Sequence, residues 1–165
     1  MEKDQIIKEK LDHSGLFDFA AFYKYMHDWF RDEQYGVVEE KYSEKISGNA
    51  RDISIEWKAM KNISDYFRIE HGIKIDVSGL TEVEVEIDGK KKKMNKGKIS
   101  LEIKGILVKD YENKWDAQPF WRFLRDVYNK YVIRARIDAL EGKVVADVKA
   151  WKDTMKAFLE LTGKR

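Results

Sequence analysis

The feature that most constrains this chain is a change in the spacing of its apolar residues. Between Val37 and Ile103, apolar residues alternate with polar ones at every second position, and the clearest stretch runs Ile53, Ser54, Ile55, Glu56, Trp57, Lys58 and Ala59. On both sides of this region, apolar residues recur at steps of three and four. Alternation is typical of half-buried strands, and the longer spacing is typical of amphipathic helices. The pattern therefore predicts an α+β fold.

The alternating region predicts an antiparallel sheet of about five strands. Its strands are expected at residues 38–46, 53–59, 67–77, 83–87 and 99–103. The links between the early strands are short, at Asn62 to Asp65 and at Ser78 to Leu80, so successive strands should be neighbours in a meander. Such a sheet has one face for helices and one for water.

The segment from Asp88 to Gly97 leaves two alternatives open. It forms either a long loop or a two-residue Asp88-Gly89 hairpin with a short extra strand. The hairpin would place opposite charges across from each other, Glu86 facing Lys91 and Glu84 facing Lys93.

Helices are expected both before and after the alternating region in the sequence, in a single domain of residues 1–165. The N-terminal part predicts two helices, a short one over Lys3 to Leu11 and a longer one within Leu16 to Gln34. Pro119 opens a long amphipathic helical region that runs to about Leu161 and packs on one sheet face. Its apolar stripe consists of Phe120, Phe123, Leu124, Val127 and Tyr131, followed by Ile137, Leu140, Val144, Val148, Trp151, Met155 and Phe158. Gly142 predicts a bend or a break between two helices.

The residue types argue against several classes of function. The chain has no cysteine and only three histidines, and no His-x-x-x-His or Gly-rich phosphate loop is present, so we expect neither a metal nor another cofactor. No catalytic residue stands out, and the sequence leans away from an enzyme without excluding one. No stretch is apolar for the length of a membrane span, and no apolar leader follows Met1, which predicts a cytoplasmic protein.

Charge is distributed unevenly along the chain, although the total is only +2. Residues 1–89 carry a net charge of −8 and the rest is strongly basic. The favoured interpretation is that the two halves pair in the fold, and the alternative is a basic face for an anionic partner. The densest basic cluster is Lys90, Lys91, Lys92 and Lys93, with Tyr111 and Trp115 downstream. The low total charge and the lack of a recognition motif argue against nucleic acid as that partner, without excluding it.

Three runs carry a resemblance. Met94-Asn95-Lys96-Gly97-Lys98, the segment from Val108 to Trp115 and Ser64-Asp65-Tyr66-Phe67 resemble uncharacterised archaeal proteins of similar length. The resemblance implies a cytosolic protein associated with archaea or with heat, and it implies no functional residue.

The sequence favours a non-catalytic interaction or assembly module over other functions. The C-terminal helix offers more apolar length than one sheet is expected to cover, which predicts self-association into a homo-oligomer. The residues expected to form that interaction surface are Val144, Val148, Trp151, Met155 and Phe158. The alternative is a carrier of an apolar small molecule or lipid, held between sheet and helix in a pocket lined by Trp57, Phe67, His71 and Ile73. In both alternatives His71 lies on an apolar strand face, where a structural role is favoured over catalysis.

Overall fold

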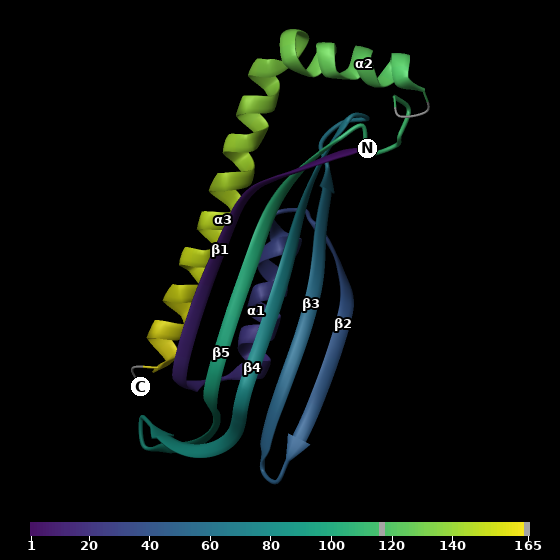
Figure 1. Cartoon of the computed structure of the whole chain (residues 1–165). Helices are drawn as coiled ribbons and strands as arrows, with labels where there is room; N and C mark the ends of the chain where they lie inside the picture. Colours follow the sequence, from purple (N-terminus) through teal and green to yellow (C-terminus); the bar gives the residue numbers. More distant parts are fainter. Residues whose placement is uncertain (116–117, 164–165) are drawn as a thin grey trace.

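The computed structural model describes residues 1–115 and 118–163 of the chain. It has an α+β fold in which a five-stranded sheet is covered on one face by helices (Figure 1). The strands are β1 (Glu2–Phe17), β2 (Gly36–Ser47), β3 (Ala50–Asn62), β4 (Phe67–Ile87) and β5 (Lys90–Lys109). The helices are α1 (Phe19–Asp32), α2 (Pro119–Val127), the π-helical turn η1 (Tyr128–Val132) and α3 (Arg134–Gly163).

The sheet is antiparallel throughout, with the strand order β1-β5-β4-β3-β2. Strands β2 to β5 form the predicted meander, and β1 joins its far edge by pairing with β5. The first and last strands of the chain are therefore neighbours, which brings the start of the chain beside the segment that leads into α2.

The predicted helix over Lys3 to Leu11 is wrong, because these residues belong to strand β1. Ile7 and Leu11 pack on the core, while Lys8 and Lys10 lie across from residues of β5. An isolated helix of nine residues is marginal in water, whereas pairing with β5 satisfies a row of backbone groups along the sheet edge. The second predicted helix is confirmed as α1, and the side chain of Asp18 accepts a hydrogen bond from the Ala21 N–H at its N-terminus.

The Asp88-Gly89 hairpin is confirmed, but residues 90–97 are the beginning of β5 and not a short extra strand. Asp88 and Gly89 have φ angles of 51° and 77°, as the tight turns that join antiparallel strands require. The predicted pairs of Glu86 with Lys91 and of Glu84 with Lys93 are present. Predicted strands 67–77 and 83–87 are one continuous β4, whose register shifts between Ser78 and Thr81.

The core lies between the sheet and the two helices α1 and α3. Stacked rings join the helices to each other, Phe22 to Phe158 and Phe30 to Trp151. The sheet contributes alternate residues, among them Ile55, Ile69, Ile75, Ile99 and Leu107. The intervening residues lie on the other face, which no described helix covers.

The helical region bends at η1 and not at Gly142. The Ile133 N–H donates to the Tyr128 carbonyl oxygen at 3.1 Å, a bond that spans five residues. This widened turn ends α2, and α3 then runs without a break through Gly142. As a result α2 lies crosswise at one end of the molecule, while α3 runs along the sheet (Figure 1).

Candidate interaction surface

The apolar stripe of α3 is part of the core. Val144, Val148 and Met155 are fully buried and Trp151 is 1% exposed, while the half-buried Phe158 stacks on Tyr25 as well as on Phe22. These residues are therefore not the exposed patch that the sequence predicted. Whether the chain self-associates by another surface stays a prediction.

Gly105 on β5 explains why one sheet can cover this stripe. A Cβ atom at Gly105 would lie 2.5 Å from Cγ1 of Val144 and 2.9 Å from Cγ2 of Val148. The missing side chain lets α3 approach the sheet closely, so that both valines fit against the backbone of β5.

Helix α2 has the opposite arrangement, because its aromatic residues are exposed and an arginine is its buried residue. Arg125 is 8% exposed, whereas Phe120 and Phe123 are each 62% exposed. Tyr131, in the adjoining η1, is 70% exposed. A surface helix normally turns its apolar face to the core. The amphipathic pattern of α2 is therefore inverted with respect to its own domain.

Polar and aromatic contacts hold α2 in this orientation. Nη1 of Arg125 lies 3.5 Å from Oδ2 of Asp110, a residue that is 2% exposed at the end of β5. The same carboxylate accepts a hydrogen bond from the Trp115 N–H at 3.1 Å. The ring of Trp115 stacks on Tyr128 with centroids 6.1 Å apart and meets Trp121 edge to face.

A second contact fixes η1. The Tyr66 hydroxyl donates to Oδ1 of Asn129, and burial of this hydroxyl raises the pKa of Tyr66 to about 12. Its proton therefore stays in place at neutral pH. Together these contacts secure the inner side of α2 and η1 and leave the outer side open.

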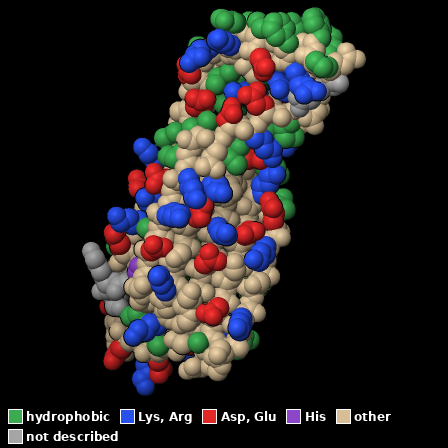
Figure 2. Space-filling model, in the orientation of Figure 1, with side chains coloured by type: hydrophobic (Ala, Val, Ile, Leu, Met, Phe, Trp, Pro, Cys, Tyr) green, Lys and Arg blue, Asp and Glu red, His purple; other side chains and the backbone are tan. Residues whose placement is uncertain are grey.

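We use the name α2 stripe for the outward side chains Phe120, Phe123, Leu124, Val127 and Tyr131, which follow each other at steps of three, one, three and four. Leu124 and Val127 are half-buried, and the other three are exposed. Figure 2 shows apolar side chains gathered over the end of the molecule that α2 forms, with charged side chains directly below them. On α3, by contrast, Val144 and Val148 are fully buried.

The sequence contains a signal that separates the two stripes. At 100° per residue, the α2 stripe and the residues from Ile137 to Phe158 would point roughly 100° apart or more on one straight helix. One sheet face could not have covered both.

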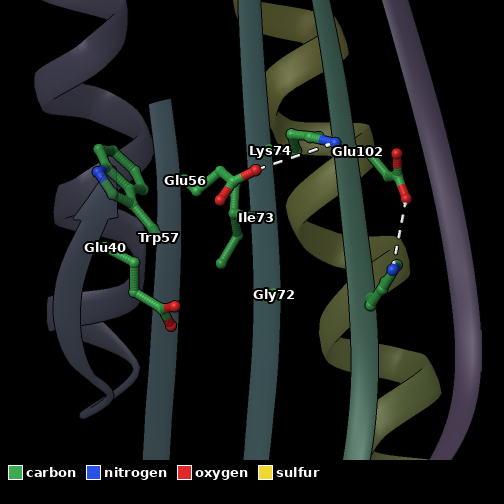
Figure 3. A pocket seen from close by; sticks show the side chains of 8 residues that line it. Glu40, Glu56, Trp57, Gly72, Ile73, Lys74 and Glu102 are labelled. Carbon is green, nitrogen blue, oxygen red and sulfur yellow. Dashed lines mark ion pairs between the residues drawn. The ribbon is translucent and has the colours of Figure 1, made fainter. Parts of the chain in front are cut away.

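The uncovered sheet face contains a shallow hollow at Gly72 (Figure 3). It measures about 210 Å³, and Trp57 and Ile73 line it together with charged side chains. Lys74 lies 3.9 Å from Glu56, and Glu102 lies 3.1 Å from Lys8 and 4.0 Å from Lys104. Because cations and carboxylates alternate across the strands, they neutralise one another, and the hollow has no surplus charge to attract an ion.

The four residues of the predicted apolar pocket lie on the helix-covered face. Trp57, Phe67 and Ile73 are each 2% exposed, and His71 is fully buried. The rings of Phe30 and Tyr35 pack against His71, with centroids 6.0 and 5.0 Å away. Aromatic rings therefore occupy the space beside His71, and binding of an apolar ligand there stays a prediction.

His71 is kept neutral by its surroundings. Burial lowers its pKa to about 4, more strongly than the nearby Asp147 carboxylate and the Lys104 backbone raise it. The Tyr35 hydroxyl donates to Oδ2 of Asp147 at 2.6 Å, and burial together with this bond raises the pKa of Tyr35. Neither ring nitrogen of His71 has a hydrogen-bond partner of good geometry in the described part of the chain.

Lys90, Lys91, Lys92 and Lys93 begin β5 at the tip of the hairpin, and all four are exposed. Lys91 and Lys93 lie across from glutamates, whereas Lys90 and Lys92 lie across from Ile87 and Val85. Half of the cluster is thus offset by neighbouring carboxylates, and its role as an anionic contact stays a prediction.

Among residues 1–115 and 118–163, no three His, Asp or Glu side chains are close enough to hold a metal ion. In the same part of the chain, no helix is long and apolar enough to cross a membrane. A scan against protein-family models, a search of curated proteins and a search of solved structures each found no match.

Proposed function

We propose that this chain is a non-catalytic interaction module that docks on its partner through the α2 stripe. The observation that carries the proposal is the inverted amphipathic pattern of α2, with Phe120 and Phe123 exposed and Arg125 buried. The proposal keeps the class of function that the sequence favoured, and moves the surface from α3 to α2.

Physical chemistry supports a docked partner for this stripe. Burial of apolar surface is worth about 25 cal/mol per Å², so each large side chain left in water forgoes roughly 1.5–3 kcal/mol. Isolated exposed apolar residues are ordinary, but a contiguous aromatic patch on one helix is typical of an interaction site. Contacts with Asp110, Trp115 and Asn129 also hold α2 and η1 in place. Binding a partner therefore does not have to order a flexible loop, which would cost binding free energy.

The test compares the chain with a variant in which the stripe is polar. Phe120→Ser, Phe123→Ser and Tyr131→Ser together remove its three exposed rings. The matched control is Val38→Thr, Tyr42→Thr and Ile46→Thr on β2, where the original residues are 50%, 52% and 68% exposed. Threonine keeps the strand preference of these positions.

Each tagged protein is produced at its native level in the source cells, and the lysate is separated by gentle centrifugation and gel filtration. We expect the wild-type chain and the β2 control in a particulate fraction or in a complex well above 19.5 kDa, and the stripe variant as the free chain. Wild-type protein that elutes as a free 19.5 kDa chain and stays in the supernatant would contradict the proposal.

A further inference from the structure

We infer that the partner of the α2 stripe is the surface of an anionic lipid bilayer. This inference rests on the proposed function and names the partner class. Three features of α2 and η1 carry it: the kind of residues exposed, the charge beside them and the shape of this end of the molecule.

The exposed residues are those that favour a membrane interface. Phe120, Phe123, Leu124 and Val127 form an apolar face, and the tyrosine Tyr131 and the tryptophan Trp121 lie beside it with polar groups on their rings. Helices that lie in the interface bury such a face to about 5–10 Å, with aromatic residues at headgroup level. Nucleic acid would stack on the rings but would leave the aliphatic Leu124 and Val127 without a partner.

The charge of the segment complements an anionic surface. Between residues 118 and 138, four exposed cations stand against two exposed carboxylates, Asp126 and Asp138. The cations are Arg122, Lys130, Arg134 and Arg136. Arg125 is not among them, because it is buried beside Asp110. Long basic side chains can extend to the headgroups while the apolar face enters the acyl region.

The shape of the molecule also favours a flat partner. Because η1 turns α2 crosswise at the end of the sheet, the whole length of α2 can meet a plane without contact from the rest of the domain (Figures 1 and 2). A nine-residue helix is only about 14 Å long. With a width of about 10 Å, its face covers about 140 Å², far less than the roughly 800 Å² per partner that a stable protein interface buries, so a second copy fits the stripe less well.

The experiment measures flotation of the purified full chain with vesicles of phosphatidylcholine alone and of phosphatidylcholine with 30 mol% phosphatidylglycerol, a composition in which anionic lipids attract basic segments. We expect binding to the anionic vesicles, at least tenfold weaker binding to the neutral ones, and weaker binding at high salt. The Ser triple variant should lose binding, and the β2 control should keep it. Arg122→Gln with Lys130→Gln should weaken binding roughly 30-fold.

Sedimentation velocity without lipid and binding to a labelled single-stranded oligonucleotide complete the test. No flotation, together with dimers that the Ser variant abolishes, would overturn the lipid inference and leave the interaction module standing with a second copy as partner. Oligonucleotide binding that the same variant abolishes, without flotation, would overturn it in favour of nucleic acid. If the chain neither floats, nor associates, nor binds the oligonucleotide, and is also free in the lysate, both proposals are overturned.

Discussion

Arg125 on α2 and Asp110 at the end of β5 form the ion pair that fixes the orientation of the exposed helix. The Arg125 side chain is 10% exposed and the Asp110 side chain 2%, and Nη1 lies 3.5 Å from Oδ2. Trp115, Tyr128 and Asn129 add contacts on the same side of α2 and η1. This arrangement turns Phe120 and Phe123 outward, because a helix whose buried side is set by an arginine must present its opposite side to solvent.

Replacing Arg125 by Leu should loosen α2 without unfolding the sheet. The ion pair is lost, and Asp110 keeps the Trp115 N–H and the N-terminal ammonium at 3.7 Å, so we expect a cost of about 1–3 kcal/mol confined to this end. Hydrogen exchange should become faster in residues 122–132 and stay unchanged in α3. Arg125→Lys, which keeps the charge, should show a smaller effect. Equal acceleration in α2 and α3 would contradict this account of the anchor.

Replacing Gly105 by Ala should destabilise the whole domain. The new Cβ would lie 2.5 Å from Cγ1 of Val144, and such overpacking costs roughly 1–3 kcal/mol. Adding Val144→Ala should recover part of this loss, which a double-mutant cycle by urea unfolding would measure. Gly72→Ala on β4 is the control, because a Cβ there meets nothing within 4 Å and should be tolerated. A neutral Gly105→Ala would mean that α3 does not approach β5 as described.

Stability should fall with acidification because of His71. Burial lowers the pKa of folded His71 from 6.5 to about 4, so the unfolded chain binds a proton first as the pH drops. The contribution is complete above pH 6.5, is lost between pH 6.5 and 4, and amounts to about 3 kcal/mol.

The measurement is urea unfolding across this range for the wild type and for His71→Leu. The difference between the two profiles should slope between pH 6.5 and 4 and flatten below it. A wild-type profile that runs parallel to that of His71→Leu would show that His71 is accessible or paired when folded.

Truncating Trp57 to Ala should cost about 3–5 kcal/mol, because a buried aromatic side chain leaves a cavity that the sheet cannot close. Trp57 is 2% exposed, and the rings of Tyr23 and His27 pack against it edge to face. Thermal or urea unfolding measures the effect, and Tyr42→Ala on exposed β2 serves as the control. A cost below about 1 kcal/mol would mean that Trp57 is not enclosed by α1.

The sequence was enough to predict the inner strands of the sheet and their buried face, but not the edge strand β1. Ile53, Ile55 and Trp57 alternate with polar residues, and this local pattern decides which face is buried. The Lys3 to Leu11 segment has spacing that suits either a helix or a strand, and its pairing with β5, about a hundred residues away, settles the choice.

The interaction surface was missed for a related reason. The apolar spacing from Phe120 onward predicts a helix and an apolar face, but not the direction in which that face points. The direction depends on the turn at η1 and on the contact of Arg125 with Asp110, neither of which has a local sequence signature. Only the phase difference between the α2 and α3 stripes was readable in advance.

The most direct test of this account is hydroxyl-radical footprinting of the purified chain, first alone and then on anionic vesicles. Alone, Phe120, Phe123 and Tyr131 should be oxidised rapidly, while Trp151 and Met155 should be protected in the core. On vesicles, the three rings of the α2 stripe should become protected and Tyr42 on β2 should not. Rapid oxidation of Trp151 and Met155, with Phe120 and Phe123 protected in the free chain, would contradict the account.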